Sequence, residues 1–443
     1  MDAWLTMSAG DLGRGINSGE IDPVALTECY LDAIEAHEFT PRIYARMTRD
    51  RALSEAGAAA KRARLGLRLS LLDGVPISWK DLFDTAGVET EAGSALLQGR
   101  KPETDAEVLR NATQAGLVCL GKTHMTELAF SGLGLNPVTA TPPCVNDHAA
   151  APGGSSSGAA TSVAFGLAVA GIGSDTGGSV RVPSAWNDLV GLKTTSGRLS
   201  LQGVVPLCAR FDTVGPLCRT VEDAALMLAA LEGSRTADLR GASLQRTKLA
   251  ILTTTAMEDV RKAPLAGFRR ATEALAAAGA TVEEIAVPEI AEAMALSPIL
   301  FASEAYGTWK AEIEAQPDLM HAAVRERFRG GKDFTASDYV AAWQTLDRLR
   351  ARYLAETAAY DAVLVPTCPI MPPDAARLDR DPDFFVTENL MTLRNTRIGN
   401  LMGLCGLTLP TGVASTGLMM LGAPMAEERL LRLGAAAEAA LKG

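Results

Sequence analysis

The chain of 443 residues is predicted to fold as an α/β protein with one large mixed, mostly parallel β-sheet covered by helices on both faces. Two observations support this prediction. Segments with apolar residues at helical spacing alternate with short apolar runs, such as Leu117–Leu120 and Ala362–Pro366, along the whole chain. The sequence also contains no internal repeat and no convincing linker. We therefore expect a single domain over residues 1–443.

Several helix boundaries are marked by capping residues. Asp22 is a good N-cap, and Pro23 follows it at the first helical position, where proline is favoured. Thr104 and Glu107 have the spacing of a capping box in front of an apolar helical segment. Thr220 is expected to cap a later helix, which should end just before a glycine. Each of these patterns predicts a helix of ordinary length.

The other expected elements follow from apolar periodicity and composition. Alanine-rich or amphipathic segments predict helices, and short apolar runs bounded by turn residues predict strands. The further helices are expected at Ala52–Leu65, Leu265–Ala278, Ser303–Ile313, Ser337–Glu356 and Ala426–Lys442, and the further strands at Lys248–Thr253, Thr281–Val287, Leu407–Pro410 and Leu418–Leu421.

Composition and charge exclude several classes of protein. Apolar residues make up 47% of the chain and charged residues 21%, which is ordinary globular usage. The net charge of -10 argues against a broad nucleic-acid contact surface, which requires a basic face. Seven cysteines without a CxxC pair indicate reduced thiols, and neither a signal peptide nor a transmembrane segment is apparent. We expect a cytoplasmic protein with no membrane or direct nucleic-acid partner.

Two glycine- and serine-rich clusters stand out in the sequence. The first covers Gly153–Gly158 and the second Gly173–Ser179, and a segment of small apolar residues, Ala159–Ala170, separates them. Glycine permits close backbone approach, and serine supplies a nucleophile or a hydrogen-bonding hydroxyl. The pair of clusters therefore predicts a site at which backbone N–H groups and hydroxyls converge.

The first cluster alone is compatible with other sites. It has the glycine spacing of a phosphate-binding loop, but Ala159 stands where the lysine is required. It also matches Gly-x-Ser-x-Gly, which would make Ser156 the nucleophile of an α/β-hydrolase with His321 as the late histidine. A flexible loop is a third alternative, although a less plausible one for two clusters that flank a helix.

A serine hydrolase that does not use histidine explains more of the sequence. The chain has four histidines and no spacing typical of a metal site, so neither a metal nor another cofactor is expected. Lys80 ends an apolar run that begins at Leu71. Alone, it would be interpreted as an edge lysine extending to water. A buried, neutral lysine can instead act as the base for a serine.

Four stretches resemble the amidase signature family. They are GVPISWKD around Lys80, PGGSSSGAA from Pro152, GSDTGGSVRVPSAWNDLVGLK from Gly173 and GRLSLQGVVPLCARFDTVGPLCRTV from Gly197. The resemblance covers a signature core of about residues 71–221, with a weaker likeness at 400–424. A divergent region of about residues 231–401 is expected to determine substrate specificity.

The resemblance implies roles for particular residues. The family's catalytic lysine, bridging serine and nucleophilic serine fall on Lys80, Ser155 and Ser179, and the two serines are 24 positions apart. The peptide bond before Ser155 is expected to be cis. Asp175 and Arg181 are expected to brace the nucleophile's turn.

Further roles follow from the same resemblance. The oxyanion hole is expected from backbone N–H groups of Thr176, Gly177 and Gly178, together with that of the nucleophile. Phe130 and Ser131 are candidates for the substrate-binding wall.

The implied function is hydrolysis of a small-molecule amide through a Ser-Ser-Lys triad, without a cofactor. An alternative from a different class is the glutaminase component of a tRNA-dependent glutamine amidotransferase, which shares the motifs and acts within a complex. A third is a binding protein without activity, which the intact Lys80, Ser155 and Ser179 argue against. The sequence does not fix the oligomeric state, for which a homodimer is the commonest arrangement.

Overall fold

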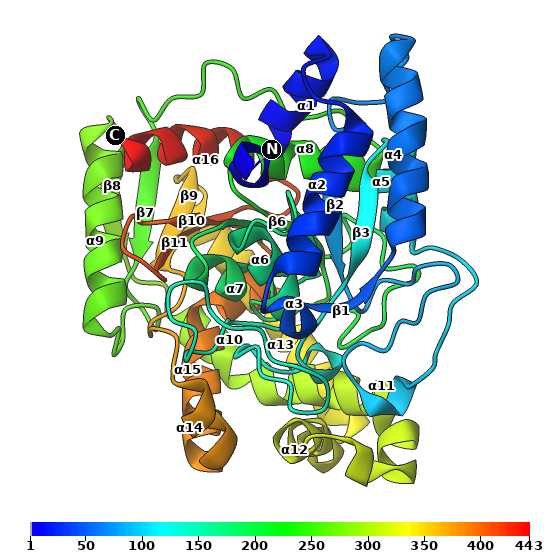
Figure 1. Ribbon diagram of the computed structural model, residues 1–443. Coiled ribbons are helices and arrows are strands. Elements are labelled where there is room, and N and C mark those ends of the chain that lie inside the picture. The colour runs from blue at the N-terminus through cyan, green and yellow to red at the C-terminus, as the bar shows by residue number, and fades with distance from the viewer. Residues whose placement is uncertain (1) are drawn as a thin grey trace.

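The computed structural model describes residues 2–443 and contains one sheet of 11 strands surrounded by helices (Figure 1). The strands are ordered β1-β3-β2-β4-β6-β5-β10-β11-β9-β7-β8 across the sheet. Their bounds are β1 Tyr44–Met47, β2 Pro76–Lys80, β3 Val118–Thr123, β4 Gly171–Ser174, β5 Val190–Lys193, β6 Val214–Cys218, β7 Lys248–Leu252, β8 Thr281–Ile285, β9 Ala362–Pro366, β10 Cys405–Pro410 and β11 Gly417–Gly422.

The helices lie between these strands in the sequence. The α-helices are α1 Ala9–Ser18, α2 Pro23–Ala36, α3 Thr40–Ile43, α4 Arg49–Arg64, α5 Glu107–Gln114, α6 Ser157–Ala164, α7 Arg181–Trp186, α8 Val221–Glu232, α9 Lys262–Ala277, α10 Glu289–Ala295, α11 Ser303–Ala315, α12 Ala322–Arg329, α13 Ala336–Thr357, α14 Ala375–Arg380, α15 Pro382–Leu401 and α16 Glu427–Lys442. Short 3₁₀ turns occupy Asp2–Thr6, Ala95–Leu97, Glu127–Ala129, Pro317–Leu319 and Gly330–Asp333, and Pro298–Ala302 is a π-helical turn.

The expected large mixed sheet is present. Within the described residues its parallel pairings form two groups, β3-β2-β4 and β9-β7-β8, which comprise four pairs. The other six neighbouring pairs are antiparallel, a larger share than the sequence predicted. For β10 and β11 the antiparallel pairing follows from the short connection between them. The turn at residues 411–416 is too short for the crossover that a parallel pair requires.

Helices lie on both faces of the sheet, as predicted. Successive residues of a strand point to opposite faces, and β10 shows where each face leads. Gly406 faces the Arg181 side chain of α7, whereas Leu407 lies against Gly434 of α16. The two helices therefore cover opposite faces. In Figure 1, α7 lies over the middle of the sheet and α16 runs along its upper end.

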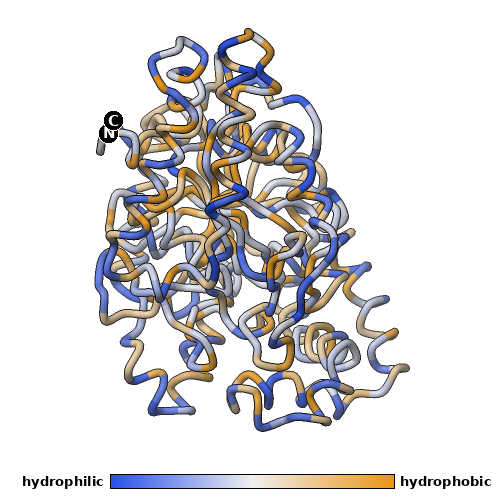
Figure 2. The backbone as a smooth tube through the Cα atoms, turned by 45° about the vertical axis from the view of Figure 1, so that its right-hand side comes forward, coloured by the Kyte–Doolittle hydropathy of each residue, from blue (hydrophilic) through white to orange (hydrophobic). Residues whose placement is uncertain are grey.

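Apolar burial holds these layers together. One large cluster of buried side chains includes all of the central strands, and a smaller one surrounds Trp186, Phe385 and Leu393 near the lower end of the molecule. In Figure 2 the hydrophobic positions gather along the interior, and hydrophilic positions alternate with them along the peripheral helices. This amphipathic pattern is the one from which the helices were predicted.

The predicted caps are confirmed in two of three cases. The Asp22 carboxylate accepts hydrogen bonds from the N–H groups of Val24 and Ala25, and the Thr220 hydroxyl accepts one from Asp223. The capping box of Thr104 and Glu107 is wrong, because α5 begins at Glu107 without a side-chain cap. The neighbouring backbone replaces it there, since the Glu107 N–H donates to the carbonyl of Gln202 at 3.1 Å.

No disulfide joins the seven cysteines, all of which lie within the described residues. Among residues 2–443, no helix has both the length and the apolar composition needed to cross a membrane.

Candidate active site

Lys80 is at the carboxyl end of β2 and is fully buried. The strand lies inside the sheet, between β3 and β4, so the interpretation of Lys80 as an edge lysine is wrong. Its Nζ donates hydrogen bonds to Ser155 Oγ at 2.6 Å and to Ser174 Oγ at 2.8 Å. The structure therefore brings the predicted lysine and bridging serine into direct contact.

The surroundings of Lys80 favour its neutral form. Burial lowers the pKa of the Lys80 ammonium to about 7, although the nearby carboxylates of Asp175 and Asp212 act in the opposite direction. Because no carboxylate among the described residues accepts its hydrogen bonds, desolvation decides the outcome. A lysine in this state can accept a proton near neutral pH.

Ser155 follows a cis peptide bond, Gly154–Ser155, as expected from the resemblance. The backbone here is packed closely, since a Cβ on Gly154 would lie 2.7 Å from the backbone of Gly134. The Ser155 carbonyl accepts a hydrogen bond from the Thr126 N–H at 3.1 Å. Ser155 is thus held by main-chain contacts on the loop that leads into α6.

Ser156 has a structural position. It is fully buried, and its Oγ donates to the Ser174 carbonyl at 3.2 Å and accepts from the Ser174 N–H at 3.3 Å. Its N–H donates to the Ser179 carbonyl at 3.3 Å, which ties the first glycine–serine cluster to the second. These contacts disfavour Ser156 as the nucleophile of an α/β-hydrolase elbow.

The turn from β4 into α7 carries Ser179, and Asp175 organises it. The Asp175 carboxylate accepts hydrogen bonds from the N–H groups of Gly178 at 2.9 Å and Val180 at 3.1 Å. It also accepts from Arg181 Nη2 at 2.8 Å and from Asn400 Nδ2 at 3.0 Å. The predicted bracing role of Asp175 and Arg181 matches this geometry.

The charge of Asp175 is balanced within the turn. Burial alone would raise the pKa of its carboxyl, but the adjacent Arg181 guanidinium holds the pKa well below its usual range. Both side chains are fully buried, so the ion pair is shielded from water. Asp175 is therefore ionised at neutral pH.

The residues predicted to form the oxyanion hole differ in whether their backbone N–H group already has an acceptor. The Gly178 N–H is already donated to Asp175. Gly178 has φ +142, and a Cβ there would lie 2.2 Å from Thr396 Oγ1, so packing requires glycine at this position. By contrast, a Cβ on Gly177 would meet no atom of the described residues within 4 Å. Thr176 and Gly177 both line the cavity that contains Ser179.

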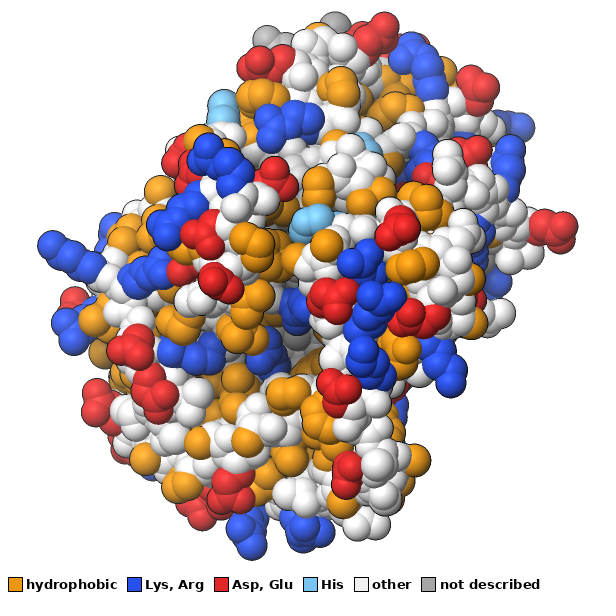
Figure 3. All heavy atoms as spheres, turned by 90° about the horizontal axis from the view of Figure 1, so that it is seen from below, with side chains coloured by type: hydrophobic (Ala, Val, Ile, Leu, Met, Phe, Trp, Pro, Cys, Tyr) orange, Lys and Arg blue, Asp and Glu red, His pale blue; other side chains and the backbone are white. Residues whose placement is uncertain are grey.

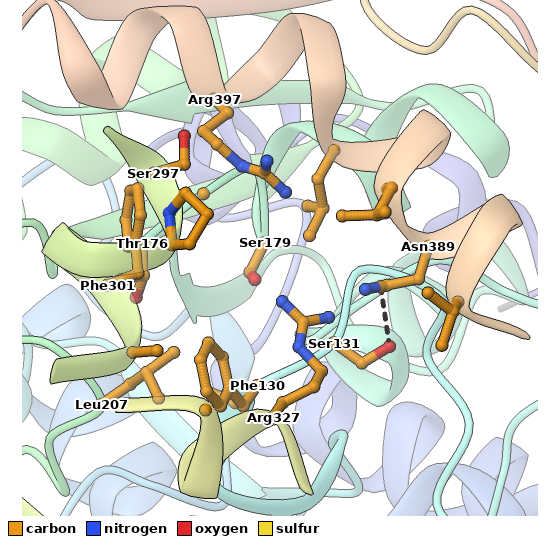
Figure 4. Close-up of a pocket in the computed structure, with 18 of the residues that line it drawn as sticks. Phe130, Ser131, Thr176, Ser179, Leu207, Ser297, Phe301, Arg327, Asn389 and Arg397 are labelled. Carbon is orange, nitrogen blue, oxygen red and sulfur yellow. Dashed lines mark hydrogen bonds between the residues drawn. The ribbon is translucent and has the colours of Figure 1, made fainter. Parts of the chain in front are cut away.

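A cavity of about 310 Å³ lies beside Ser179 (Figure 4). Phe130 and Ser131 belong to its wall, where the sequence predicted them. The Ser131 hydroxyl donates to Asn389 Oδ1 at 3.0 Å, and the Phe130 ring packs against the edge of Phe328. The helices that complete the wall lie at the lower end of Figure 1, and Figure 3, which views that end, shows hollows flanked by hydrophobic and basic side chains.

The sequence assigned no individual role to three residues at this site. Ser174 is the second residue of the motif that begins at Gly173. It contacts Lys80 because β2 and β4 are parallel neighbours, with Trp79 opposite Ile172. The register of two strands almost a hundred residues apart leaves no signal in the sequence. Arg327 and Arg397 line the cavity from the divergent region, in which no motif marks them.

We predict that Arg181→Met destabilises the fold by about 3–5 kcal/mol, because it leaves the buried Asp175 carboxylate uncompensated. The free energy of unfolding from chemical denaturation measures the loss. Arg14→Met is the control, since the pair that Arg14 forms with Glu222 is half exposed and should contribute below about 1 kcal/mol. Equal losses in the two variants would contradict the role of Arg181.

Comparison with known proteins agrees with this geometry. The family model described as Amidase matches residues 25–431. The chain is 35% identical to 2-amino-5-chloromuconic acid deaminase of Comamonas testosteroni, over 98% of this chain and 96% of that protein. It is 32% identical to the A component of the glutamyl-tRNA(Gln) amidotransferase of Lactococcus lactis subsp. cremoris (strain SK11), over 95% of this chain and 93% of that protein.

Solved structures show the same fold. A crystal structure of an amidase superposes with a TM-score of 0.87 at 29% identity, covering 98% of this chain and 99% of that one. The native peptide amidase of Stenotrophomonas maltophilia superposes with a TM-score of 0.82 at 26% identity, covering 99% of this chain and 97% of that one. The chain therefore belongs to the amidase family, and it is an amide-hydrolysing enzyme.

Proposed function

We propose that this enzyme hydrolyses the C–N bond of a small-molecule amide with Lys80, Ser155 and Ser179 as its catalytic triad. The observation that carries the proposal is the buried contact of 2.6 Å between Lys80 Nζ and Ser155 Oγ, beside a cavity whose wall includes Ser179. The products would be a carboxylate and ammonia or an amine. The similarity to a deaminase named for a small organic acid supports a small-molecule substrate.

The proposed reaction begins with Lys80 neutral. Ser179 Oγ attacks the amide carbonyl carbon, its proton passes to Ser155 Oγ, and the Ser155 proton passes to Lys80 Nζ. When the C–N bond breaks, the proton returns through Ser155 to the leaving nitrogen. A water molecule then attacks the acyl ester on Ser179 and passes a proton through Ser155 to Lys80. The bond between the acyl carbon and Ser179 Oγ breaks, the proton returns through Ser155 to Ser179 Oγ, and the carboxylate is released. Ser174, a second acceptor for Lys80, holds Nζ in position.

The negative charge of the tetrahedral intermediate needs N–H donors. We assign this role to Thr176, Gly177 and Ser179, and we leave out the Gly178 N–H because Asp175 already accepts it. The open space beside Gly177 is compatible with close approach of the substrate. Each such donor contributes on the order of 3 kcal/mol in the transition state.

Lys80→Met should lower kcat by about 10²- to 10⁴-fold, because the relay then lacks its base. Labelling of Ser179 by a fluorophosphonate, followed by mass spectrometry, should slow in the same variant and be absent in Ser179→Ala. Lys61→Met, at an exposed position of α4, is the control, and thermal unfolding verifies that each variant is folded. Wild-type turnover in Lys80→Met would refute the proposed base.

The rate should rise with pH through an apparent pKa near 7. The active form of Lys80 is neutral, burial lowers its pKa to about 7, and the neutral fraction therefore grows as the pH increases. Ser174→Ala removes an acceptor that favours the charged form, so it should move the midpoint to lower pH. The measurement is kcat/KM between about pH 5.5 and pH 9; a profile that falls across this range would exclude a neutral lysine base.

The glutaminase component of an amidotransferase complex is a second candidate, favoured by the 32% identity to the A component of glutamyl-tRNA(Gln) amidotransferase. The two functions differ in their dependence on partners. As a free-standing hydrolase, the purified chain alone should release ammonia or amine from small amides. An amidotransferase component should instead co-purify with its partner chains from the native host and show glutaminase activity that depends on them. Co-purification with partner chains, together with glutaminase activity that requires them, would favour the amidotransferase component over the free-standing hydrolase.

A further inference from the structure

Two arginine side chains enter the cavity that contains Ser179. Arg327 belongs to α12 and Arg397 to α15, and both are among the lining residues. In Figure 4 their guanidinium groups extend into the cavity from opposite sides, with Ser179 between them. Much of the remaining wall is apolar, and includes Phe130, Leu207 and Phe301. Two cations therefore face an otherwise hydrophobic space next to the nucleophile.

Neither arginine has an acidic partner among the described side chains. Their neighbours on α12 differ: Arg325 pairs with Glu326, and Arg329 pairs with Glu314 and Glu326. Glu326, the acidic residue of the cavity wall, is thus engaged by these two arginines. Arg327 Nη1 is buried and has no hydrogen-bond acceptor within residues 2–443. The cavity holds positive charge that nothing in the described structure neutralises.

The two arginine side chains are half-buried, and their guanidinium groups remain charged. Burial lowers the pKa of Arg327 to about 9, with a further contribution from the positive charge of Arg397. Burial lowers the pKa of Arg397 to about 10. Both values are above neutral pH, so two unpaired cations lie close enough to repel each other. A buried charge without a partner destabilises a protein, and a bound anion would relieve both the desolvation and the repulsion.

The position of Arg327 is fixed before any ligand arrives. Its guanidinium lies over the ring of Phe130, 4.5 Å from the centroid. Stacking on an aromatic ring leaves the N–H groups at the guanidinium edge free to point into the cavity. These groups form a planar fork that matches the two oxygens of a carboxylate. The fork of Arg327 is therefore available for bidentate binding.

We infer that Arg327 and Arg397 bind a free carboxylate group of the substrate, so that the preferred substrates are amides that also carry a carboxylate, such as monoamides of short dicarboxylic acids. The amide carbonyl would face Ser179, the carboxylate would lie between the two guanidinium groups, and the apolar wall would contact the carbon chain. This inference rests on the proposed function, because it names the substrate class of the same site.

The first test compares matched substrates. Malonamate, succinamate, glutaramate and adipamate are each paired with the alkyl amide in which a methyl group replaces the carboxylate. For at least one pair, kcat/KM should favour the carboxylate by about tenfold or more. Arg327→Met and Arg397→Met should each lower this preference by a similar factor. Arg327→Lys, which keeps the charge but loses the planar fork, should retain part of it.

The control is Arg377→Met. Arg377 also lies over an aromatic ring, that of Phe384 at 3.7 Å, but it is not among the residues that line the cavity. Its substitution should leave the preference unchanged. Thermal unfolding shows which variants are folded, and Arg327 and Arg397 provide independent tests. A wild-type preference for the neutral amides, or an unchanged preference in both arginine variants, would overturn the inference.

A binding experiment separates this inference from the proposed function. Ser179→Ala protein should bind succinate or glutarate in calorimetry, and adding Arg327→Met should weaken that binding about tenfold or more. If the dicarboxylates bind in this way but the wild type hydrolyses no amide, the proposed function fails and the anion site stands. If neutral amides are hydrolysed and the dicarboxylates do not bind, the function stands and the inference fails.

Discussion

The proposed catalytic site depends on keeping a lysine neutral within the sheet. Lys80 donates its hydrogen bonds to two serine hydroxyls, and burial lowers its pKa to about 7. A direct ion pair with a carboxylate would favour the ammonium and remove the base. Asp175, which lies near enough to act on Lys80 electrostatically, must therefore have its charge compensated by another group. This constraint accounts for the arrangement around the nucleophile.

Arg181 supplies that compensation and also joins two parts of the chain. Its guanidinium pairs with Asp175 and donates to the Thr396 carbonyl at 2.7 Å. The Thr396 hydroxyl donates in turn to the Gly177 carbonyl at 2.7 Å. The turn that carries Ser179 is thereby fastened to α15, the helix that also contributes Asn389 and Arg397 to the cavity. The proposed nucleophile and the arginine proposed to bind substrate are thus held in one hydrogen-bonded unit.

The sequence predicted the parts of this site that depend on local patterns. The α/β class, the helix at Asp22 and the contact between Lys80 and Ser155 follow from periodicity, capping and a family resemblance. The strand order, the role of Ser174 and the arginines follow from contacts between distant segments, which no local pattern reports. The sequence also could not show that the Gly178 N–H is engaged. This group donates to the Asp175 carboxylate, and that contact depends on the conformation of the Asp175 side chain.

Burial acts on Lys80 and on the cavity arginines with opposite consequences. It lowers the pKa in each case, to about 7 for Lys80 but only to about 9 for Arg327 and about 10 for Arg397, because a free guanidinium is far more basic than an amine. Near neutral pH, the same desolvation therefore favours the neutral form of the lysine and leaves the arginines as cations. A lysine at position 327 or 397 would be closer to losing its charge on burial, so arginine is the residue suited to binding an anion beside this nucleophile.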